Sequence, residues 1–384
     1  MTISRRKFTQ LLGASAAAAV ARPALSLAKT VAGDSPSQGV ATAVVRLSSN
    51  ENPYGPSPKA FKAMSDAFGL ACRYPDEHSE ALVESLARLN GVASGEILLG
   101  DGSGEILKLC ADVYTGPLMN ERNAVGRGTL VVADPTFEAI LYHAKLNDAE
   151  IVKIPLTPSF SHDLPKMLAA AKKGLVYICN PNNPTASIST KNEVREFVEK
   201  APADTMILVD EAYHHYADSP DYESMIPLVK DHPNLIVTRT FSKIYGMAGL
   251  RCGYCIAQSQ TIERLRERQS WDSINLMALA AATASLEDPD QVTKGRRLNA
   301  ETRAFTTSEL EKMGFLTIPS QANFIMIDVK RPVVPLIATL KSRKVQVGRL
   351  FRPMPSHLRV TIGRKSEMEA FLTVFREVTA PTPT

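Results

Sequence analysis

Two hydrophobic runs of the sequence each lead into residues that could do chemistry. Asp210 directly follows the run Met-Ile-Leu-Val, and the phenol of Tyr213 comes three residues later. Lys243 lies beyond the next such run, Leu-Ile-Val, and Arg251 follows it by eight residues. A carboxylate at a strand end can simply cap a helix, and a lysine there can simply be solvated. Together they predict a site where the Lys243 amine forms a Schiff base with a carbonyl cofactor, because desolvation and a neighbouring cation lower a lysine pKa.

Two turns add further polar groups. Residues 100–104, Gly-Asp-Gly-Ser-Gly, open a predicted helix whose free N–H groups and dipole suit a phosphate. Their spacing differs from the dinucleotide-binding fingerprint, and a plain helix cap is the alternative. Asn183 lies in an Asn-Pro turn after another strand-like run, where prolines fix the turn and aim the side chain inwards. A simple turn is the alternative there, but the repeated placement after strands favours a site.

The segments that must position these residues alternate between strands and helices. Predicted strands cover 129–133, 175–179, 206–209 and 235–237, and predicted helices cover 137–145, 191–200 and 262–271. This alternation predicts an α/β fold with a doubly wound, mainly parallel sheet and ligands at the carboxyl ends of its strands. Beyond residue 285, a smaller α+β domain is predicted from a charged helix at 294–313, strands at 322–328 and 358–362, and a final helix at 366–378.

Length, composition and charge narrow the function classes. The chain has 384 residues, of which 44% are hydrophobic and five are cysteine, which excludes a disordered chain and a disulfide-dense scaffold. The net charge of +4 comes entirely from residues 1–28, which contain four basic residues and no acid. The remaining chain is neutral, which argues against nucleic acid or an anionic membrane surface as a partner.

Residues 1–28 are typical of a twin-arginine signal peptide. Arg5 and Arg6 precede an apolar run at 11–21 and a small-residue exit at 26–28. An amphipathic helix is disfavoured because the run has no polar face, and Arg22 ends it well short of the roughly 20 apolar residues of a membrane span. We expect export by the twin-arginine machinery to the periplasm, no stable membrane anchor, and a flexible mature N-terminus over residues 29–45.

The cysteines and a histidine pair could suggest other chemistry. Cys252 and Cys255 are three apart on a predicted strand and therefore point to opposite faces, which disfavours a disulfide or a metal site. We interpret all five cysteines as buried small hydrophobic residues. His214 and His215 have no partner carboxylate at ligand spacing, so no metal is predicted.

The motifs together resemble the fold-type I pyridoxal-phosphate aminotransferases of class I/II, and within them the histidinol-phosphate aminotransferase branch. The similar segments are LSSNENPYG at 47–55, RYPD at 73–76, DPTF at 134–137, FSKIYGMAGLRCG at 241–253 and LRVTIG at 358–363. They span residues 47–363 in the family's order. The resemblance implies an N-terminal arm over 46–75 that forms part of the small domain, a large cofactor-binding domain over 76–285 and a small domain over 286–384.

The resemblance also implies a role for each matching residue. Lys243 would carry the internal aldimine of pyridoxal 5'-phosphate and then move the proton between the substrate α-carbon and the cofactor. Asp210 would pair with the pyridinium nitrogen, Asn183 and Tyr213 would hydrogen-bond the ring oxygen, and Phe137 would stack on the ring.

The phosphate and the substrate have their own implied partners. Ser103, Gly104, Ser242 and Arg251 would hold the cofactor phosphate, and Tyr74 would reach it from a neighbouring subunit, so a homodimer is expected. Substrate anions would bind Arg359 through its guanidinium fork, with Asn52 and Arg352 as further substrate-side residues. Two departures from the family pattern are Ala186, where glycine is usual, and Gly104, where an acid is common. Arg359 follows Arg352 by only seven positions, so the far end of the substrate pocket can differ from the family's.

Three functions follow from these features. The first is ping-pong transamination between an amino acid or amino phosphate, histidinol-phosphate-like or aromatic, and a 2-oxo acid. The second is decarboxylation or elimination on the same cofactor scaffold. The third is a non-enzymatic, exported solute-binding protein, which shares the size, compartment and α/β architecture.

Overall fold

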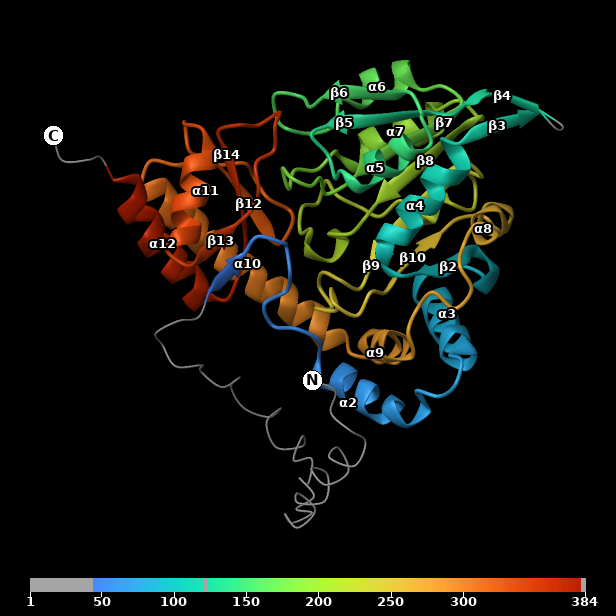
Figure 1. The fold of residues 1–384 in the computed structure, drawn as a ribbon, viewed down its shortest axis with the longest axis horizontal. Coiled ribbons are helices and arrows are strands. Elements are labelled where there is room, and N and C mark those ends of the chain that lie inside the picture. Colours follow the sequence, from blue (N-terminus) through green and yellow to red (C-terminus); the bar gives the residue numbers. More distant parts are fainter. Residues whose placement is uncertain (1–43, 121–122, 381–384) are drawn as a thin grey trace, which may run out of the picture. The chain divides into compact units, whose positions relative to one another are not determined.

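The computed structural model describes residues 44–120 and 123–380, and Figure 1 shows their arrangement as a ribbon. The predicted signal and most of the predicted mature N-terminus fall outside these residues. The described residues form one compact unit. Its largest sheet has seven strands in the order β2-β10-β9-β8-β7-β5-β6. Their bounds are β2 Ile97–Gly100, β5 Thr129–Asp134, β6 Ile151–Pro155, β7 Gly174–Cys179, β8 Thr205–Asp210, β9 Leu235–Thr240 and β10 Gly253–Ile256.

The sheet is mixed but mainly parallel, which confirms the predicted α/β class. Strands β6, β5, β7, β8 and β9 pair in parallel, whereas β10 runs antiparallel to both β9 and β2. Every residue of β7, β8 and β9 is buried. Near-continuous apolar strands of this kind are expected where helices cover both faces of a sheet.

Two hydrophobic cores lie on the two faces of this sheet. Alternate residues of each strand divide between them: Ile207 and Val209 of β8 lie in one core, and Met206 and Leu208 lie in the other. The first core includes residues of α3 (Asp76–Asn90), α6 (Leu164–Ala170), α7 (Lys191–Lys200) and α9 (Leu276–Leu286). The second includes residues of α4 (Gly102–Tyr114), α5 (Ala139–Leu146) and α8 (Ser259–Arg266).

The C-terminal residues build a separate core around a second sheet. Strands β11 (Leu316–Thr317), β12 (Phe324–Asp328) and β14 (His357–Thr361) form it, with α11 (Val333–Ser342) and α12 (Lys365–Thr379) packed nearby in Figure 1. The N-terminal strand β1 (Val45–Leu47) pairs in parallel with β13 (Val345–Val347), and Leu47 lies in this core. The described part of the chain therefore starts in the C-terminal layer and then enters the large sheet.

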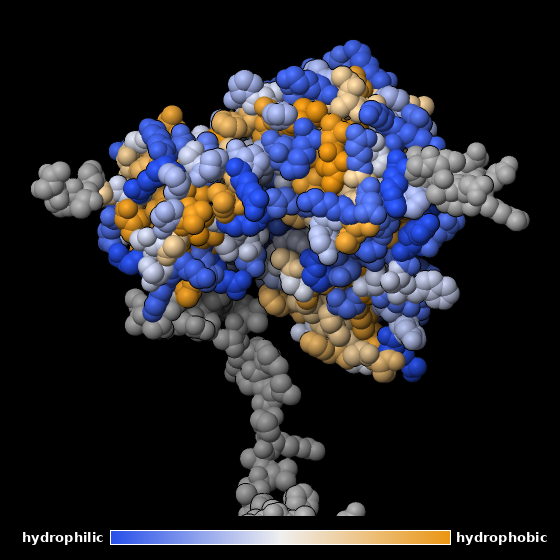
Figure 2. Space-filling model, turned by 45° about the horizontal axis from the view of Figure 1, so that its top comes forward, coloured by the Kyte–Doolittle hydropathy of each residue, from blue (hydrophilic) through white to orange (hydrophobic). Residues whose placement is uncertain are grey.

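The remaining elements connect these layers. They are α2 (Pro58–Ala67), α10 (Pro289–Lys312), the hairpin β3 (Pro117–Asn120) and β4 (Asn123–Arg127), and short 3-10 helices at Phe68–Leu70, Ser94–Glu96, His214–Tyr216 and Ile226–Leu228. None of the helices among the described residues is long and apolar enough to cross a membrane. Figure 2 shows hydrophilic residues spread over the face drawn, with apolar residues in groups between them.

Local signals explain which predicted helix boundaries were right. The α7 boundary matches the prediction because Thr190 caps it: its hydroxyl accepts from the Glu193 backbone, and Glu193 accepts from the Thr190 N–H in return. The predicted helix at 262–271 is too long, since α8 ends at Arg266. Beyond it, the Gln269 side chain bonds Leu99 O instead of continuing the helix. The helix predicted at 294–313 starts five residues earlier, where Pro289 takes its first turn.

Candidate active site

A cavity of about 230 Å³ lies where the carboxyl ends of β7, β8 and β9 meet the N-terminus of α4. This is the position at which open α/β sheets bind ligands. It brings together all of the predicted site residues except Tyr74, Asn52 and Arg352. The lining residues are Ser49, Asn50, Ser103, Gly104, Phe137, Cys179, Asn183, Asp210, Ala212, Tyr213, Thr240, Ser242, Lys243, Arg251 and Arg359.

Lys243 is the amine of the cavity. Its Nζ donates to the backbone oxygen of Asn50 at 3.3 Å and lies 5.4 Å from the centre of the Tyr213 ring. Burial, aided by the charge of Arg359, lowers the pKa of Lys243 to about 8. A sizeable neutral fraction is therefore present near neutral pH, as a nucleophilic amine requires.

Asp210 is the carboxylate opposite this amine. It ends β8, is 3% exposed, and accepts hydrogen bonds from the Tyr177 hydroxyl at 2.8 Å and the Ala212 N–H at 3.1 Å. Burial raises the pKa of Asp210 to about 6. A carboxylate held in place by two donors, and costly to ionise alone, is suited to a cationic group that enters the cavity.

Asn183 and Tyr213 present polar atoms to the same space. The Asn183 Oδ1 accepts from Arg359 Nη1 at 2.7 Å, so its Nδ2 is left to donate to a ligand. The Tyr213 hydroxyl accepts from Asn50 Nδ2 at 3.0 Å and keeps its proton for another acceptor. Burial raises the pKa of Tyr213, so this proton is retained. Ala186, in the turn that carries Asn183, has a φ of 60°, the left-handed conformation that explains the family's usual glycine.

The N-terminus of α4 forms a cradle for an anion. Gly102 has a φ of 70°, and a Cβ on it would lie 2.1 Å from Arg251 Nη2, so only glycine lets the guanidinium pack there. Arg251 Nη2 donates to Asp101 O at 3.2 Å. The Ser242 Oγ accepts from Thr240 Oγ1 at 2.9 Å and can donate its own proton. The helix dipole, free N–H groups and one guanidinium together favour a phosphate.

Arg359 of β14 is the second cation of the cavity. Its Nη2 donates to Ser48 O at 2.7 Å, and its guanidinium lies 5.1 Å from the centre of the Phe351 ring. Its Nε is buried and has no hydrogen-bond partner among residues 44–120 and 123–380. Burial lowers the pKa of Arg359 from its ordinary value, and an anion that binds there would offset this cost.

Three predicted residues lie outside the cavity. Asn52 instead donates to Ile244 O at 2.8 Å, Arg352 is exposed on a turn, and Tyr74 is 81% exposed. Sequence reasoning overlooked Asn50, which is buried, has a φ of 55°, and contacts both Tyr213 and Lys243. Its signal was available, because asparagine is one of the few residues that adopt this conformation readily.

The other reactive residues form no competing site. All five cysteines are free; four are buried as expected, but Cys72 is exposed, so that prediction was wrong for it. Cys72 follows the 3-10 helix Phe68–Leu70 in an exposed stretch without a core to bury it. No group of three or more possible metal ligands occurs in the described part of the chain. Burial lowers the pKa of His214 to about 2 and that of His215 well below its usual value, so both are neutral.

Comparison with known proteins agrees with this geometry. Residues 42–375 match the family model for aminotransferase class I and II. The histidinol-phosphate aminotransferase of Moorella thermoacetica is 37% identical and covers 88% of this chain and 86% of that protein. The histidinol-phosphate aminotransferase of Symbiobacterium thermophilum is also 37% identical, and the match covers 86% of this chain and 89% of that protein. A similar solved structure is that of histidinol-phosphate aminotransferase from Sinorhizobium meliloti in complex with pyridoxal-5'-phosphate. It is 26% identical in sequence, the match covers 88% of this chain and 91% of that chain, and the TM-score is 0.80.

Proposed function

Because the chain belongs to the class I and II aminotransferases and depends on pyridoxal 5'-phosphate, we propose that it transfers an amino group from a histidinol-phosphate-like or aromatic donor to a 2-oxo acid. The two half-reactions share one site, so the kinetics are ping-pong. The observation that carries this proposal is the convergence of Lys243, Asp210 and Arg359 on one cavity. Family membership excludes a non-enzymatic solute-binding protein.

The residues of the cavity fit the cofactor. The cradle formed by Ser103, Gly104, Ser242 and Arg251 suits its phosphate, and Asp210 suits its ring nitrogen. Asn183 and Tyr213 supply donors for its ring oxygen, and Phe137 supplies an aromatic face. When bound, pyridoxal 5'-phosphate supplies a carbonyl to which amines attach and an electron-withdrawing ring.

Lys243 has two tasks in this proposal. Its Nζ would hold the cofactor through the cofactor's carbonyl carbon, and as a free amine it would be the base that takes up the substrate α-proton. A pKa of about 8 suits both tasks, because the neutral and protonated forms are both populated near neutral pH. Asn50 O, 3.3 Å from Nζ, orients the released amine.

Arg359 and its surroundings support an anionic substrate. Its guanidinium lines the cavity and also an adjoining open recess of about 570 Å³, where Lys341 and Arg349 add two further cations. Glu138, which accepts from Arg349 Nη2 at 2.5 Å, is the acid that balances one of them. A substrate with a carboxylate or phosphate at one end matches this distribution of charge.

The function is tested by the visible spectrum of the purified protein and its change on addition of amino donors. We expect a band from lysine-bound cofactor that is lost with histidinol phosphate or an aromatic amino acid and returns with a 2-oxo acid. An amine product formed without any need for a 2-oxo acid would instead identify a decarboxylase. A colourless protein that takes up no cofactor would contradict both enzyme functions.

Replacing Arg359 by lysine should weaken substrate binding. Lysine keeps the charge but loses the fork that bonds an anion at two points. We expect KM for the amino donor to rise about 10- to 100-fold with a smaller change in kcat, from the roughly 1.5–3 kcal/mol of a charged hydrogen bond. Steady-state kinetics measure this, and Arg352→Lys, outside the cavity, is the matched control. Equal KM values for the two variants would contradict the role.

Replacing Gly102 by alanine should weaken cofactor binding. The new Cβ would lie 2.1 Å from Arg251 Nη2 and would push that guanidinium out of the phosphate cradle. We expect the dissociation constant for pyridoxal 5'-phosphate to rise at least about tenfold, which corresponds to roughly 1.4 kcal/mol. Equilibrium titration of cofactor-free protein measures it. Gly249→Ala, which has open space around it, should bind as the parent does.

We further propose a homodimer in which Tyr74 serves the neighbouring subunit's phosphate site. In its own chain Tyr74 is 81% exposed and lies outside the cavity, and Phe61, Phe68 and Leu70 nearby in sequence are also exposed. Such side chains are more favourably placed in an interface than in water. Analytical ultracentrifugation of the mature protein should give twice the chain mass, and a monomer with bound cofactor would contradict this arrangement.

Export by the twin-arginine route is also a proposal, because residues 1–28 lie outside the described part of the chain. It is supported by the Arg5-Arg6 pair and by the transport of already folded proteins, which allows cofactor insertion before export. Changing both arginines to lysine keeps the charge, yet we expect at least a tenfold loss of periplasmic protein. Immunoblots of cell fractions measure this, with Arg22→Lys as control. An unchanged periplasmic fraction, or exported protein without cofactor, would count against the route.

A further inference from the structure

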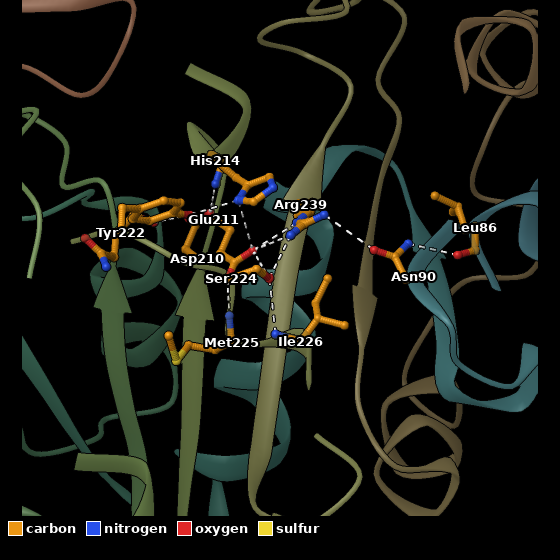
Figure 3. A network of polar contacts seen from close by, with 12 residues as sticks. Leu86, Asn90, Asp210, Glu211, His214, Tyr222, Ser224, Met225, Ile226 and Arg239 are labelled. Carbon is orange, nitrogen blue, oxygen red and sulfur yellow. Dashed lines mark hydrogen bonds and ion pairs between the residues drawn. The ribbon is translucent and has the colours of Figure 1, made fainter. Parts of the chain in front are cut away.

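Glu211 and Arg239 form a buried ion pair (Figure 3), and neither residue lines the cavity. The side chains of Glu211 and Arg239 are 1% and 8% exposed. Arg239 donates through Nε and Nη2 to Glu211 Oε2 at 2.9 and 2.8 Å. Ser224 Oγ and the Met225 N–H donate to the same carboxylate at 2.8 and 2.7 Å. The buried carboxylate is therefore fully supplied with donors.

The other hydrogen bonds of Arg239 connect the pair to two further segments, the loop that carries Ser224 and the helix α3. Nη2 also donates to Ser224 Oγ at 2.7 Å, and Nη1 reaches Asn90 Oδ1 at 3.4 Å. Asn90 in turn donates to Leu86 O at 2.8 Å near the end of α3. Figure 3 shows this chain of contacts running from β8 across β9 to α3.

The pair occupies the point at which β8 and β9 separate. The backbone register of these strands ends at Asp210 and Thr238, and the Glu211 N–H donates to Thr238 O at 2.9 Å. Glu211 directly follows Asp210, and Arg239 precedes Lys243 by four residues. Side chains that link residues 211 and 239 therefore fix the two strand ends from which the catalytic groups extend.

We propose that the Glu211–Arg239 pair is a positioning device, which holds the ends of β8 and β9 at the separation that lets Asp210 and Lys243 engage one cofactor molecule. This proposal rests on the proposed function. Stability alone does not account for it, because a buried ion pair is often no more stabilising than well-packed apolar side chains of the same volume. The geometry suits the pair to positioning, because a shift of either side chain would move the end of β8 or β9.

One charge of the pair, that of Glu211, also affects the pKa of the Asp210 carboxyl. That carboxyl is faced by Tyr177 and Cys179 of β7, by Lys243 and Tyr213, and by Glu211 next to it. Burial is the main cause of its raised pKa, and the Glu211 charge adds to it. Removing Arg239 alone leaves the Glu211 charge uncompensated, whereas removing both charges does not, so a test must replace both.

The double variant Glu211→Leu with Arg239→Met provides this test. We expect a thermal midpoint at or above the parent's, together with at least a tenfold higher dissociation constant for pyridoxal 5'-phosphate and a displaced pH midpoint of the visible band. Asp218→Asn with Arg303→Met removes another ion pair, 3.4 Å long, which contacts no cavity residue, and should leave both cofactor readouts unchanged. A stable double variant with the parental dissociation constant and midpoint would overturn the proposal.

Arg239→Lys keeps the proposal testable if the double variant does not fold. It preserves the charge but bonds Glu211 at a single point, so we expect a folded protein with a several-fold higher cofactor dissociation constant. Parental values for this variant would also overturn the proposal. The parent protein separates the two hypotheses. If it shows no lysine-bound cofactor band, the proposed function itself fails. If it shows a normal band and the variants bind the cofactor as the parent does, only the positioning role is contradicted.

Discussion

Replacing Lys243 by alanine is expected to abolish both cofactor attachment and turnover. No other lysine is among the described residues that line the cavity, and the amine is both the attachment point and the base in the proposed reaction. Losing both contributions should lower kcat by at least about 10⁴-fold. Absorption spectroscopy would show loss of the lysine-bound band, and coupled assays would measure the residual rate.

A matched lysine makes this result specific. Lys191 is half-buried and its Nζ donates to Pro220 O at 2.9 Å, outside the cavity, so Lys191→Ala should keep the parental spectrum and rate. Cofactor bound without covalent attachment in Lys243→Ala is compatible with the mechanism, because the phosphate cradle is untouched. Full activity in Lys243→Ala would contradict the proposed mechanism.

Asp210→Asn is expected to reduce activity and to increase the stability of the cofactor-free protein. Asparagine retains hydrogen-bonding partners for Tyr177 and Ala212 but supplies no charge for the cofactor ring nitrogen. Removing one partner of a buried charge pair costs roughly 3–5 kcal/mol, so kcat/KM should fall at least about 10²-fold. Steady-state kinetics at saturating cofactor measure this loss.

The stability change has a definite sign and pH window. The pKa of Asp210 is raised from 3.8 to about 6 in the folded state, so the native protein favours the protonated carboxyl. That contribution is lost as the pH rises through 6, above which ionisation costs about 3 kcal/mol. The asparagine variant should therefore gain up to this amount in urea unfolding at pH 8, and less at pH 5.

Asp163→Asn is the control, because the pKa of Asp163 is shifted in the opposite direction. Asp163 caps α6 away from the cavity, and its hydrogen bond with Lys166 lowers its pKa, so its replacement should bring no gain above pH 6 and no loss of activity. Unchanged turnover in Asp210→Asn would contradict the role of the carboxylate. Equal stability of parent and variant at pH 8 would contradict the raised pKa.

Residues predicted from local sequence were located best when a strand end positions them. Asp210 ends β8, Lys243 follows β9 by three residues and Asn183 follows β7, so the parallel sheet brings all three to one edge. Arg352 shows the limit of this reasoning. It lies near Arg359 in sequence, but the turn after β13 leaves it exposed, while β14 carries Arg359 into the cavity.

Contacts between distant segments were not predictable in the same way. Asn50 reaches Tyr213 and Lys243, 163 and 193 residues away, because β1 pairs with β13 and brings the N-terminal segment into the C-terminal layer. Tyr177 points to Asp210 because the register of β7 and β8 aligns their ends. A local pattern can mark Asn50 as a residue with an unusual backbone, but no local pattern indicates either of these long-range contacts.

The family, the cofactor and the predicted strand-end residues could be read from the sequence, because short motifs encode local geometry and hydrophobic periodicity encodes the strands. The surroundings of these residues came from the folded chain: the Asn50 contacts, the unpartnered Nε of Arg359 and the Glu211–Arg239 pair. Burial, pKa and hydrogen-bond partners depend on which segments pack together across more than a hundred residues, and local patterns do not specify that packing.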